Sequence, residues 1–330
     1  MLHRLLKGRT VAVFAVVSFC AAVAHAQTLK LTLGHGAAPG NPRHEAAVRF
    51  AEIVKAKSGG RIEVQVAPSA QLGDDAAMVT ALRSGALDMS ANSQGAVSNA
   101  VPEYAAFGMP FLFSDLRSAW RVLDGPLGKE LAEKSAEKGL IVLGYWDNGI
   151  RHMTNSKRPI VKPEDLRGLK MRTPPDPVTV DIMKALGAEP QQIRFSELYV
   201  ALQQGVVDGQ ENPLMNIHSA KLYEVQKHLA LTGHKYEMTP FLMSKRTWDR
   251  LSEADRRIIQ EAANEATQLQ RRLSAEADAK LLDELKARGM QVTVADKAAF
   301  ERATANVDDQ WMAGPIGPFV RKVIAAARGR

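Results

Sequence analysis

The chain of 330 residues contains a single cysteine, Cys20, so it has no partner with which to form an internal disulfide bond. It also lacks an uninterrupted apolar run of the roughly 20 residues that a membrane-spanning helix needs. The stability of the fold must therefore come from a hydrophobic core. The usual domain size of about 100 to 200 residues predicts two domains for a chain of this length.

Sequence motifs of common catalytic and cofactor sites are missing as well. There is no HExxH, CxxC, GxSxG, Walker A or GxGxxG segment. The eight histidines are scattered, and none lies four residues from another. We therefore expect no zinc site and no cofactor.

The charge of the chain does not indicate a nucleic-acid partner. Its isoelectric point is 9.4, but Lys and Arg are interspersed with Asp and Glu, and no basic cluster is interleaved with aromatic residues. A modest positive potential suits an anionic small ligand equally well. We expect a small-molecule partner and no nucleic acid.

Residues 1–26 read as a secretory signal peptide. The first nine residues carry three basic side chains and no acid, 11–24 are largely apolar, and Ala24-His25-Ala26 is a cleavage site. Cleavage after Ala26 removes three positive charges and Cys20, which lowers the formal charge from +7 to +4. Lipoprotein cleavage before Cys20 is disfavoured by the bulky Phe19. We expect a periplasmic protein.

Strands and helices alternate in the first half of the chain. Hydrophobic periodicity predicts strands at 29–33, 62–66, 86–91 and 140–146, and helices at 42–57, 74–84 and, for the most part, 116–138. Such alternation is typical of an α/β sheet with largely parallel pairing.

The pattern restarts after Arg151. It predicts strands at 170–172 and 206–210, and helices at 178–186, at 196–204 with Ser196 as its cap, and at 214–225. From Ser252 to about Arg288 there is neither glycine nor proline. One helix of that length would reach about 50 Å, so we expect it to brace two lobes. The chain should cross between the lobes near 148–149 and 236–239, as in a two-lobed binder with a cleft.

Arg172 is the centre of the predicted site. It ends a short strand directly before Thr173-Pro174-Pro175, and ligands of open α/β sheets bind beyond the carboxyl ends of the strands. Arginine stays protonated and offers paired N–H donors that match a carboxylate. A surface salt bridge to a glutamate is the alternative interpretation of this residue.

Four motifs between Arg151 and Pro213 carry a family resemblance. They are Arg151-His152-Met153-Thr154-Asn155-Ser156, Gly168-Leu169-Lys170-Met171-Arg172-Thr173-Pro174, Phe195-Ser196-Glu197-Leu198-Tyr199, and Gly205-Val206-Val207-Asp208-Gly209-Gln210-Glu211-Asn212-Pro213. In this order the chain resembles the extracytoplasmic solute-binding proteins of TRAP transporters, DctP type. These proteins capture organic acids in the periplasm and deliver them to a membrane permease.

The resemblance implies roles for residues of the second half. Arg172 would grip the ligand carboxylate, Asn212 would hold Arg172 or that carboxylate, and Arg151 would be a second arginine at the ligand. Phe195 would cover one face of the ligand. The alternatives are a helix N-cap for Asn212, a core position for Phe195, and for Arg151 a pairing with acids such as Asp147. Glu211 would offset buried guanidinium charge, because an unpaired buried charge is costly.

In the first half, the resemblance places specificity residues in three loops. They contain His35, Asp75 in Gln71–Asp75, and Ser93 in Asn92–Gln94. His35 as a solvated loop histidine is the alternative. Ser93 stands where a sialic-acid-binding member has a glutamate, which argues against a bulky amino sugar acid. Tyr236, near the second crossing, is a further candidate.

The resemblance implies discontinuous lobes, 27–149 plus 238–277 and 150–237 plus 278–330. The expected function is capture of a small hydroxy- or keto-monocarboxylate for a permease that has a small four-helix and a large multi-helix subunit. Uronic acids and C4-dicarboxylates are alternative ligands, and a ligand-sensing subunit for a histidine kinase is an alternative role. A periplasmic hydrolase with His35, Ser93 and Asp75 as a triad is the enzyme alternative, but no nucleophile motif supports it. We expect no enzymatic activity.

Overall fold

The computed structural model describes residues 28–329, so the predicted signal peptide and its cleavage site lie outside the described residues. One mixed sheet runs through this part of the chain in the order β2-β1-β3-β8-β4-β7-β5-β6, and β9 pairs with β8. The strands are β1 (Leu29–His35), β2 (Ile62–Ala67), β3 (Met89–Ala91), β4 (Leu140–Asn155), β5 (Lys170–Thr173), β6 (Glu189–Gln192), β7 (Gly209–Pro213), β8 (His228–Ser244) and β9 (Gln291–Val294).

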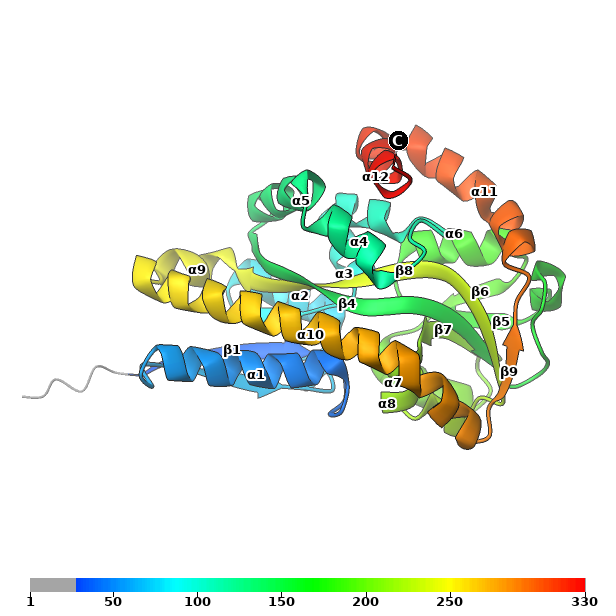
Figure 1. The fold of residues 1–330 in the computed structure, drawn as a ribbon, viewed down its shortest axis with the longest axis horizontal. Helices are drawn as coiled ribbons and strands as arrows, with labels where there is room; N and C mark the ends of the chain where they lie inside the picture. Colours follow the sequence, from blue (N-terminus) through cyan, green and yellow to red (C-terminus); the bar gives the residue numbers. More distant parts are fainter. Residues whose placement is uncertain (1–27, 330) are drawn as a thin grey trace, which may run out of the picture.

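Helices cover both sides of this sheet (Figure 1). They are α1 (Pro42–Lys57), α2 (Asp75–Ser84), α3 (Gln94–Ser98), α4 (Leu116–Leu123), α5 (Pro126–Glu137), α6 (Pro177–Ala185), α7 (Phe195–Gln203), α8 (Leu214–Ser219), α9 (Lys245–Arg250), α10 (Glu253–Ala287), α11 (Lys297–Ala313) and α12 (Gly317–Ala327). Three 3₁₀ turns are η1 (Pro102–Gly108), η2 (Pro163–Leu166) and η3 (Leu222–Glu224). None of the helices within 28–329 is long and apolar enough to cross a membrane.

Two long antiparallel strands, β4 and β8, form the middle of the sheet. The parallel strands β1 and β2 join it through β3, which pairs with β8 at 241–243. The parallel strands β5 and β6 join it through β7, which pairs with β4 at 151–155. The expectation of largely parallel pairing therefore holds for the two wings and is wrong for the centre. A chain that crosses the molecule and returns must pair with itself in opposite directions.

Several helix ends follow from local chemistry. The side chain of Asn41 accepts a hydrogen bond from the Arg43 N–H at 3.0 Å, and Pro42 occupies the first turn of α1, as predicted. The predicted helix 116–138 is divided into α4 and α5, because Pro126 starts a new helix. Ser196 does not cap α7, which begins one residue earlier without a side-chain cap.

Two observed strands differ in their bounds from the predicted ones. Strand 206–210 is observed at Gly209–Pro213, because this segment pairs with residues 151–155 of β4. The predicted strand 140–146 continues to Asn155, through a segment rich in polar residues that hydrophobic periodicity does not recognise. Helix 214–225 is shorter and ends at Ser219.

The long helix α10 has 35 residues and begins at the Ser252 cap, as predicted. Its Ile259, Ala262, Ala263 and Ala266 belong to a core cluster with Phe50 of α1. Its Leu285 belongs to a second cluster, which includes residues of α7 and α8. Figure 1 shows the helix extending beside both parts of the molecule. The predicted bracing helix is thus confirmed.

Gln270 attaches α10 to the middle of β4. Its Oε1 accepts a hydrogen bond from the Asp147 N–H at 2.8 Å, and its Nε2 donates to the Asp147 carbonyl oxygen at 2.8 Å. The side-chain amide therefore replaces a neighbouring strand where the β4–β8 register shifts between Asp147 and Gly149. All of these groups are buried, so loss of the amide would leave two main-chain groups without partners.

We expect Gln270→Ala to lower the free energy of unfolding by about 2 to 4 kcal/mol, because two buried main-chain groups lose their hydrogen bonds. Urea unfolding measures the change. The control is Gln268→Ala, a change at an exposed position of the same helix. Equal stability of the two variants would contradict the structural role of the Gln270 amide.

Candidate ligand-binding site

A cavity of about 520 Å³ lies between the two parts of the molecule. Its wall combines side chains from α1, α2 and α3, from the segments after β5 and β6, and from the middle of β4 and β8. The polar residues that line it are Arg43, Asp74, Asp75, Thr80, Ser93, Asn148, Arg151, Arg172, Gln192, Arg194, Ser196, Asn212, Asn216 and Glu237.

Arg172 is a buried arginine of the cavity wall that has no salt-bridge partner in the described residues. Its side chain is 2% exposed, and its Nε donates a hydrogen bond to the Ile193 carbonyl oxygen at 2.7 Å. Within residues 28–329, no carboxylate lies within 4.0 Å of it, and its two terminal nitrogens have no hydrogen-bond partner. Burial lowers the pKa of Arg172 to about 10, so it remains protonated at neutral pH. The guanidinium of Arg172 is thus held in place through Nε, and its two terminal nitrogens are available to donate hydrogen bonds.

Phe195 lies beside this guanidinium. The centre of its ring is 6.0 Å from Cζ of Arg172, the outer limit of a cation–π contact. Phe195 is partly buried, lines the cavity and also packs against the core cluster of α7. Phe195 thus combines a place on the cavity wall with core packing, and its contact with a ligand stays a prediction.

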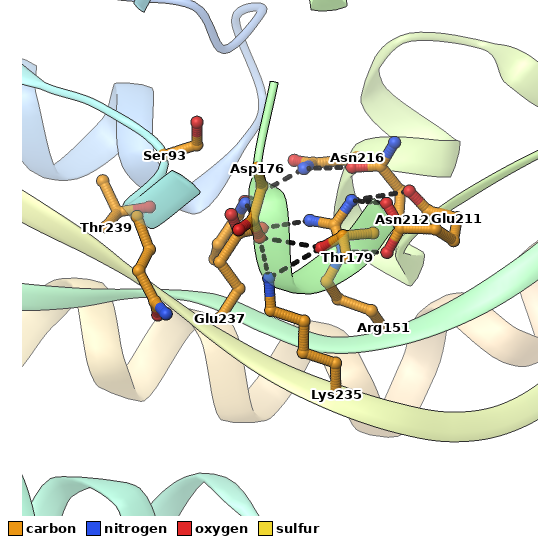
Figure 2. A network of polar contacts seen from close by, with 12 residues as sticks. Ser93, Arg151, Asp176, Thr179, Glu211, Asn212, Asn216, Lys235, Glu237 and Thr239 are labelled. Carbon is orange, nitrogen blue, oxygen red and sulfur yellow. Dashed lines mark hydrogen bonds and ion pairs between the residues drawn. The ribbon is translucent and has the colours of Figure 1, made fainter. Parts of the chain in front are cut away.

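Arg151 is compensated by protein acids. It donates to the Glu211 Oε2 and to the Glu237 Oε2, and its Nη2 lies 2.7 Å from the Glu211 Oε1 (Figure 2). Burial alone would raise the pKa of Glu211, but the Arg151 charge and the His234 hydrogen bond lower it to about 2. Arg151 lines the cavity, and its contact with a ligand stays a prediction. The alternative, pairing with acids, is observed, and Glu211 offsets buried guanidinium charge as expected. The suggested partner Asp147 was wrong.

A chain of amide side chains crosses the cavity floor. Asn216 donates to Asn212 Oδ1 at 3.0 Å and to Asn148 Oδ1 at 2.9 Å. Asn148 also accepts from Arg43 Nη2 at 2.9 Å and donates to Glu237 Oε2 at 2.7 Å. Asn212 is therefore tied to its neighbours rather than to Arg172, and it does not cap α8.

Arg43 was missed by the sequence reasoning. It is 5% exposed and donates to Thr239 Oγ1 at 2.9 Å, but its Nε is buried without a hydrogen-bond partner in the described residues. It lies in the first turn of α1, where the helix dipole disfavours a positive charge. A basic residue at this unfavourable position was the feature of the sequence that could have identified Arg43. No comparable feature of the sequence marks Glu237, Asn148 or Asn216.

Asp75 and Ser93 meet at the wall formed by α2 and α3. The Ser93 N–H donates to Asp75 Oδ2 at 3.1 Å, while Asp75 Oδ1 is buried without a partner in the described residues. Glu237 Oε1 is a second such acceptor. Both oxygens are available to accept a hydrogen bond from water or from a bound molecule.

His35 and Tyr236 were expected at the site, and neither lines the cavity. His35 is buried behind the loop of Gly36, and its Nε2 lies 3.3 Å from His44 Nδ1. Burial and the Arg43 charge lower the pKa of His35 to about 3. Tyr236 is buried and donates its hydroxyl hydrogen to Asp147 at 2.8 Å. His35 is thus not a solvated loop histidine, and we leave both residues out of the proposed site.

Metal coordination has no support at this site. In the part of the chain that the structure describes, no group of three or more His, Cys, Asp or Glu side chains is arranged to hold a metal ion. The cavity instead offers guanidinium and amide donors together with carboxylate acceptors, the groups that bind carboxylates and hydroxyls.

Comparison with known proteins identifies the family. Residues 33–314 match the family described as bacterial extracellular solute-binding protein, family 7, or DctP. The chain belongs to this family, the extracytoplasmic solute-binding proteins of TRAP transporters of the DctP type. The predicted family and the predicted two-lobed α/β fold are therefore confirmed.

Three relatives illustrate the range of the match. An uncharacterized protein of Sinorhizobium fredii is 56% identical over 278 residues, which make up 84% of this chain and 51% of that protein. The match thus spans about half the length of this relative. A TRAP periplasmic solute-binding protein of a Polaromonas species, bound to D-erythronate, is 39% identical, with a TM-score of 0.87 and coverage of 91% and 98% of the two chains. The sugar acid binding protein of Advenella mimigardefordensis, in complex with galactonate, is 35% identical, with a TM-score of 0.89 and coverage of 92% and 99%.

Asp147 supplies a pH-dependent test of the region behind the cavity. Burial raises its pKa from 3.8 to about 6, against the hydrogen bonds from Trp120 and Tyr236. Since its charged form is disfavoured in the folded state, this group costs stability as pH rises from about 4 to 6. Asp147→Asn removes the titration. We expect the unfolding free energy of the variant to gain about 2 to 3 kcal/mol relative to the wild type between pH 4 and pH 7. A difference that is constant with pH, in urea unfolding, would contradict this assignment.

Proposed function

We propose that this protein is the periplasmic solute-binding subunit of a TRAP transporter. It binds a small hydroxy- or keto-monocarboxylate through Arg172. One observation supports the anchor above all: a buried guanidinium on the cavity wall has two terminal nitrogens without a partner in the described residues. A carboxylate matches these two parallel donors and offsets the cost of burying the charge.

Charge balance favours a monocarboxylate over a dicarboxylate. The ionised groups around the cavity are four arginines and four acids: Arg43, Arg151, Arg172 and Arg194, with Asp74, Asp75, Glu211 and Glu237. This set is formally neutral, so a monoanion brings it to −1 and a dianion to −2. The additional charge of a dianion would lie in a buried site that already contains Asp75 and Glu237.

The end of the ligand opposite the carboxylate should carry hydroxyl groups. Asp75 Oδ1 and Glu237 Oε1 both need a hydrogen-bond donor, and a hydroxyl supplies one. D-erythronate and galactonate, which are bound in two of the relatives, are both monocarboxylates with several hydroxyls. These relatives support the ligand class and do not identify the ligand of this chain.

Alternative ligands and roles have less support. A uronic acid has the same groups in a ring and is the nearest alternative. A C4-dicarboxylate is disfavoured by the charge balance described above.

The triad required of a hydrolase is not assembled, because His35 pairs with His44 and Ser93 reaches Asp75 through its main-chain N–H. A role in sensing for a histidine kinase would use the same site, and neighbouring genes for a four-helix and a multi-helix membrane protein would favour transport.

Delivery to the permease completes the proposal. The predicted lobes, 27–149 plus 238–277 and 150–237 plus 278–330, would close on the ligand, since each contributes part of the cavity wall. The closed form would dock on the small and large membrane subunits. Export would use residues 1–26 as a signal peptide cleaved after Ala26.

The anchor is tested by Arg172→Lys, which keeps the charge and loses the planar fork. We expect binding to weaken by about 1.5 to 3 kcal/mol, the scale of charge-assisted hydrogen bonds. Calorimetry with the best acid from a thermal-shift screen gives the value. The exposed Arg167→Lys is the matched control. Unchanged affinity in Arg172→Lys would remove Arg172 from the site, and a screen in which only amines, peptides or neutral sugars stabilise the protein would exclude the ligand class.

Asp75→Asn tests the choice between hydroxyl and carboxylate. The variant keeps an acceptor oxygen but loses the negative charge that repels a second carboxylate. We expect galactonate to bind the variant roughly 10-fold more weakly, the scale of one hydrogen bond to a charged group. Succinate should bind the variant more tightly than the wild type. Competition experiments with both acids measure the shift, and an equal change for the two would contradict a selective role of Asp75.

A further inference from the structure

A second buried ion pair lies beside the anchor, outside the cavity wall. Lys235 of β8 is fully buried, its Nζ pairs with Asp176 Oδ2, and it donates to Thr179 Oγ1 at 2.9 Å (Figure 2). Asp176 also receives the Thr179 hydroxyl hydrogen at 2.7 Å and caps α6 through the Val178 N–H at 3.1 Å. A helix cap does not need a lysine. Burying one is costly unless it is paired, so this lysine points to a role beyond capping.

The position of Asp176 connects this pair to ligand binding. It follows Arg172 by four residues, at the end of the turn Thr173–Asp176, and the two prolines of the turn line the cavity. Lys235 therefore ties this turn to β8, two residues before Glu237, which also lines the cavity. The ion pair between Lys235 and Asp176 thus fixes the position of the turn Thr173–Asp176 relative to β8.

Two glycines of the first lobe pack over the pair at very short range. A Cβ on Gly95 of α3 would lie 2.3 Å from the Asp176 Cβ and 3.2 Å from its Cα. A Cβ on Gly108 of η1 would lie 2.8 Å from the Lys235 Cε. Any side chain at Gly95 would overlap Cβ of Asp176 and come into tight contact with its Cα, so the observed approach of the lobes requires glycine there.

Other contacts join the lobes on the same side. Asn99 Nδ2 donates to the Pro175 carbonyl oxygen at 3.2 Å, within the turn that follows the anchor. At the cavity wall, Arg194 Nε lies 2.9 Å from Asp74 Oδ2. The first lobe thus contacts the turn of the anchor directly.

We propose that Lys235 and Asp176 are positioning residues for ligand capture: their ion pair holds the turn after Arg172 in place, and Gly95 lets the first lobe close onto that turn. The inference rests on the proposed binding function. It adds that affinity depends on a contact that touches neither the ligand nor the cavity. Ligand binding favours the closed form, and that form requires the contact between Gly95 and Asp176.

Gly95→Ala is the decisive variant, because it removes no charge and no cavity group. The control is Gly314→Ala, where an added Cβ would lie 3.4 Å from its nearest neighbour, the Trp311 carbonyl oxygen, an ordinary contact. The probe is D-erythronate or galactonate, whichever raises the melting temperature of the wild-type protein more. We expect the Kd of Gly95→Ala, from calorimetry, to rise at least about 10-fold, the scale of a typical coupling between two states, and that of Gly314→Ala to stay unchanged. The fall in radius of gyration on ligand addition should be smaller in Gly95→Ala than in the wild type.

The ion pair is tested by Lys235→Met and by the double variant Lys235→Met/Asp176→Asn. The single variant leaves a buried carboxylate unpaired, so its melting temperature and its affinity should both fall. The double variant keeps a competent cap, since asparagine caps helices as well as aspartate does, and should regain most of the melting temperature. It should not regain the affinity, which a purely structural role would restore.

The outcomes separate the inference from the function. A wild-type protein that binds none of a panel of hydroxy- and ketomonocarboxylates contradicts the proposed function, and the inference with it. A wild-type protein that binds, together with unchanged affinity in Gly95→Ala, overturns the inference and leaves the function standing. Recovery of wild-type affinity in the double variant overturns the positioning role of the ion pair.

Discussion

The guanidinium of Arg151 is the interaction on which the rest of the site depends. It projects from β4 and binds carboxylates of β7 and β8 at once, so it links the three central strands at one point. Removal of one partner from such a buried group costs about 3 to 5 kcal/mol. Glu211 and Glu237 both pair with Arg151, and neither lies within 4.0 Å of Arg172. The charges of Glu211 and Glu237 still act on Arg172, the proposed anchor, at longer range.

The central strands also determine how the lobes can move. In the described residues, β4 and β8 are continuous through the region where the chain crosses between lobes, and their register shifts three times along the pair. The proposed closure of the lobes would therefore bend the paired strands at these irregular points, rather than rotate the lobes about loose linkers. Helix α10 lies across the same region and contributes to core clusters on both sides, which restrains that bending.

Much of this arrangement could be read from the sequence, and the failures have physical reasons. Arg172 was proposed as a site residue because it ends a short strand directly before Thr173-Pro174-Pro175, within a motif that resembles the family. The second half of β4 was missed because its buried face carries hydrogen-bonding groups, so no apolar alternation marks it. His35 and Tyr236 lie in segments that do reach the site, but their side chains turn into the core. Side-chain direction at a loop or crossing depends on packing partners that are far away in the sequence.

The lack of a carboxylate beside Arg172 in the described residues has a consequence for handling the protein. A buried cation without a counter-ion is unfavourable, and the cavity that contains it is large enough for small anions of the growth medium or the buffer. Preparations from cells should therefore carry acetate or a native monocarboxylic acid through purification. A co-purified anion in the cavity would lower the apparent affinity of every ligand added later, because the two compete for the same site. Unfolding the protein on a column, washing it and refolding it in an inorganic buffer with a weakly binding anion is the appropriate start for any measurement of binding.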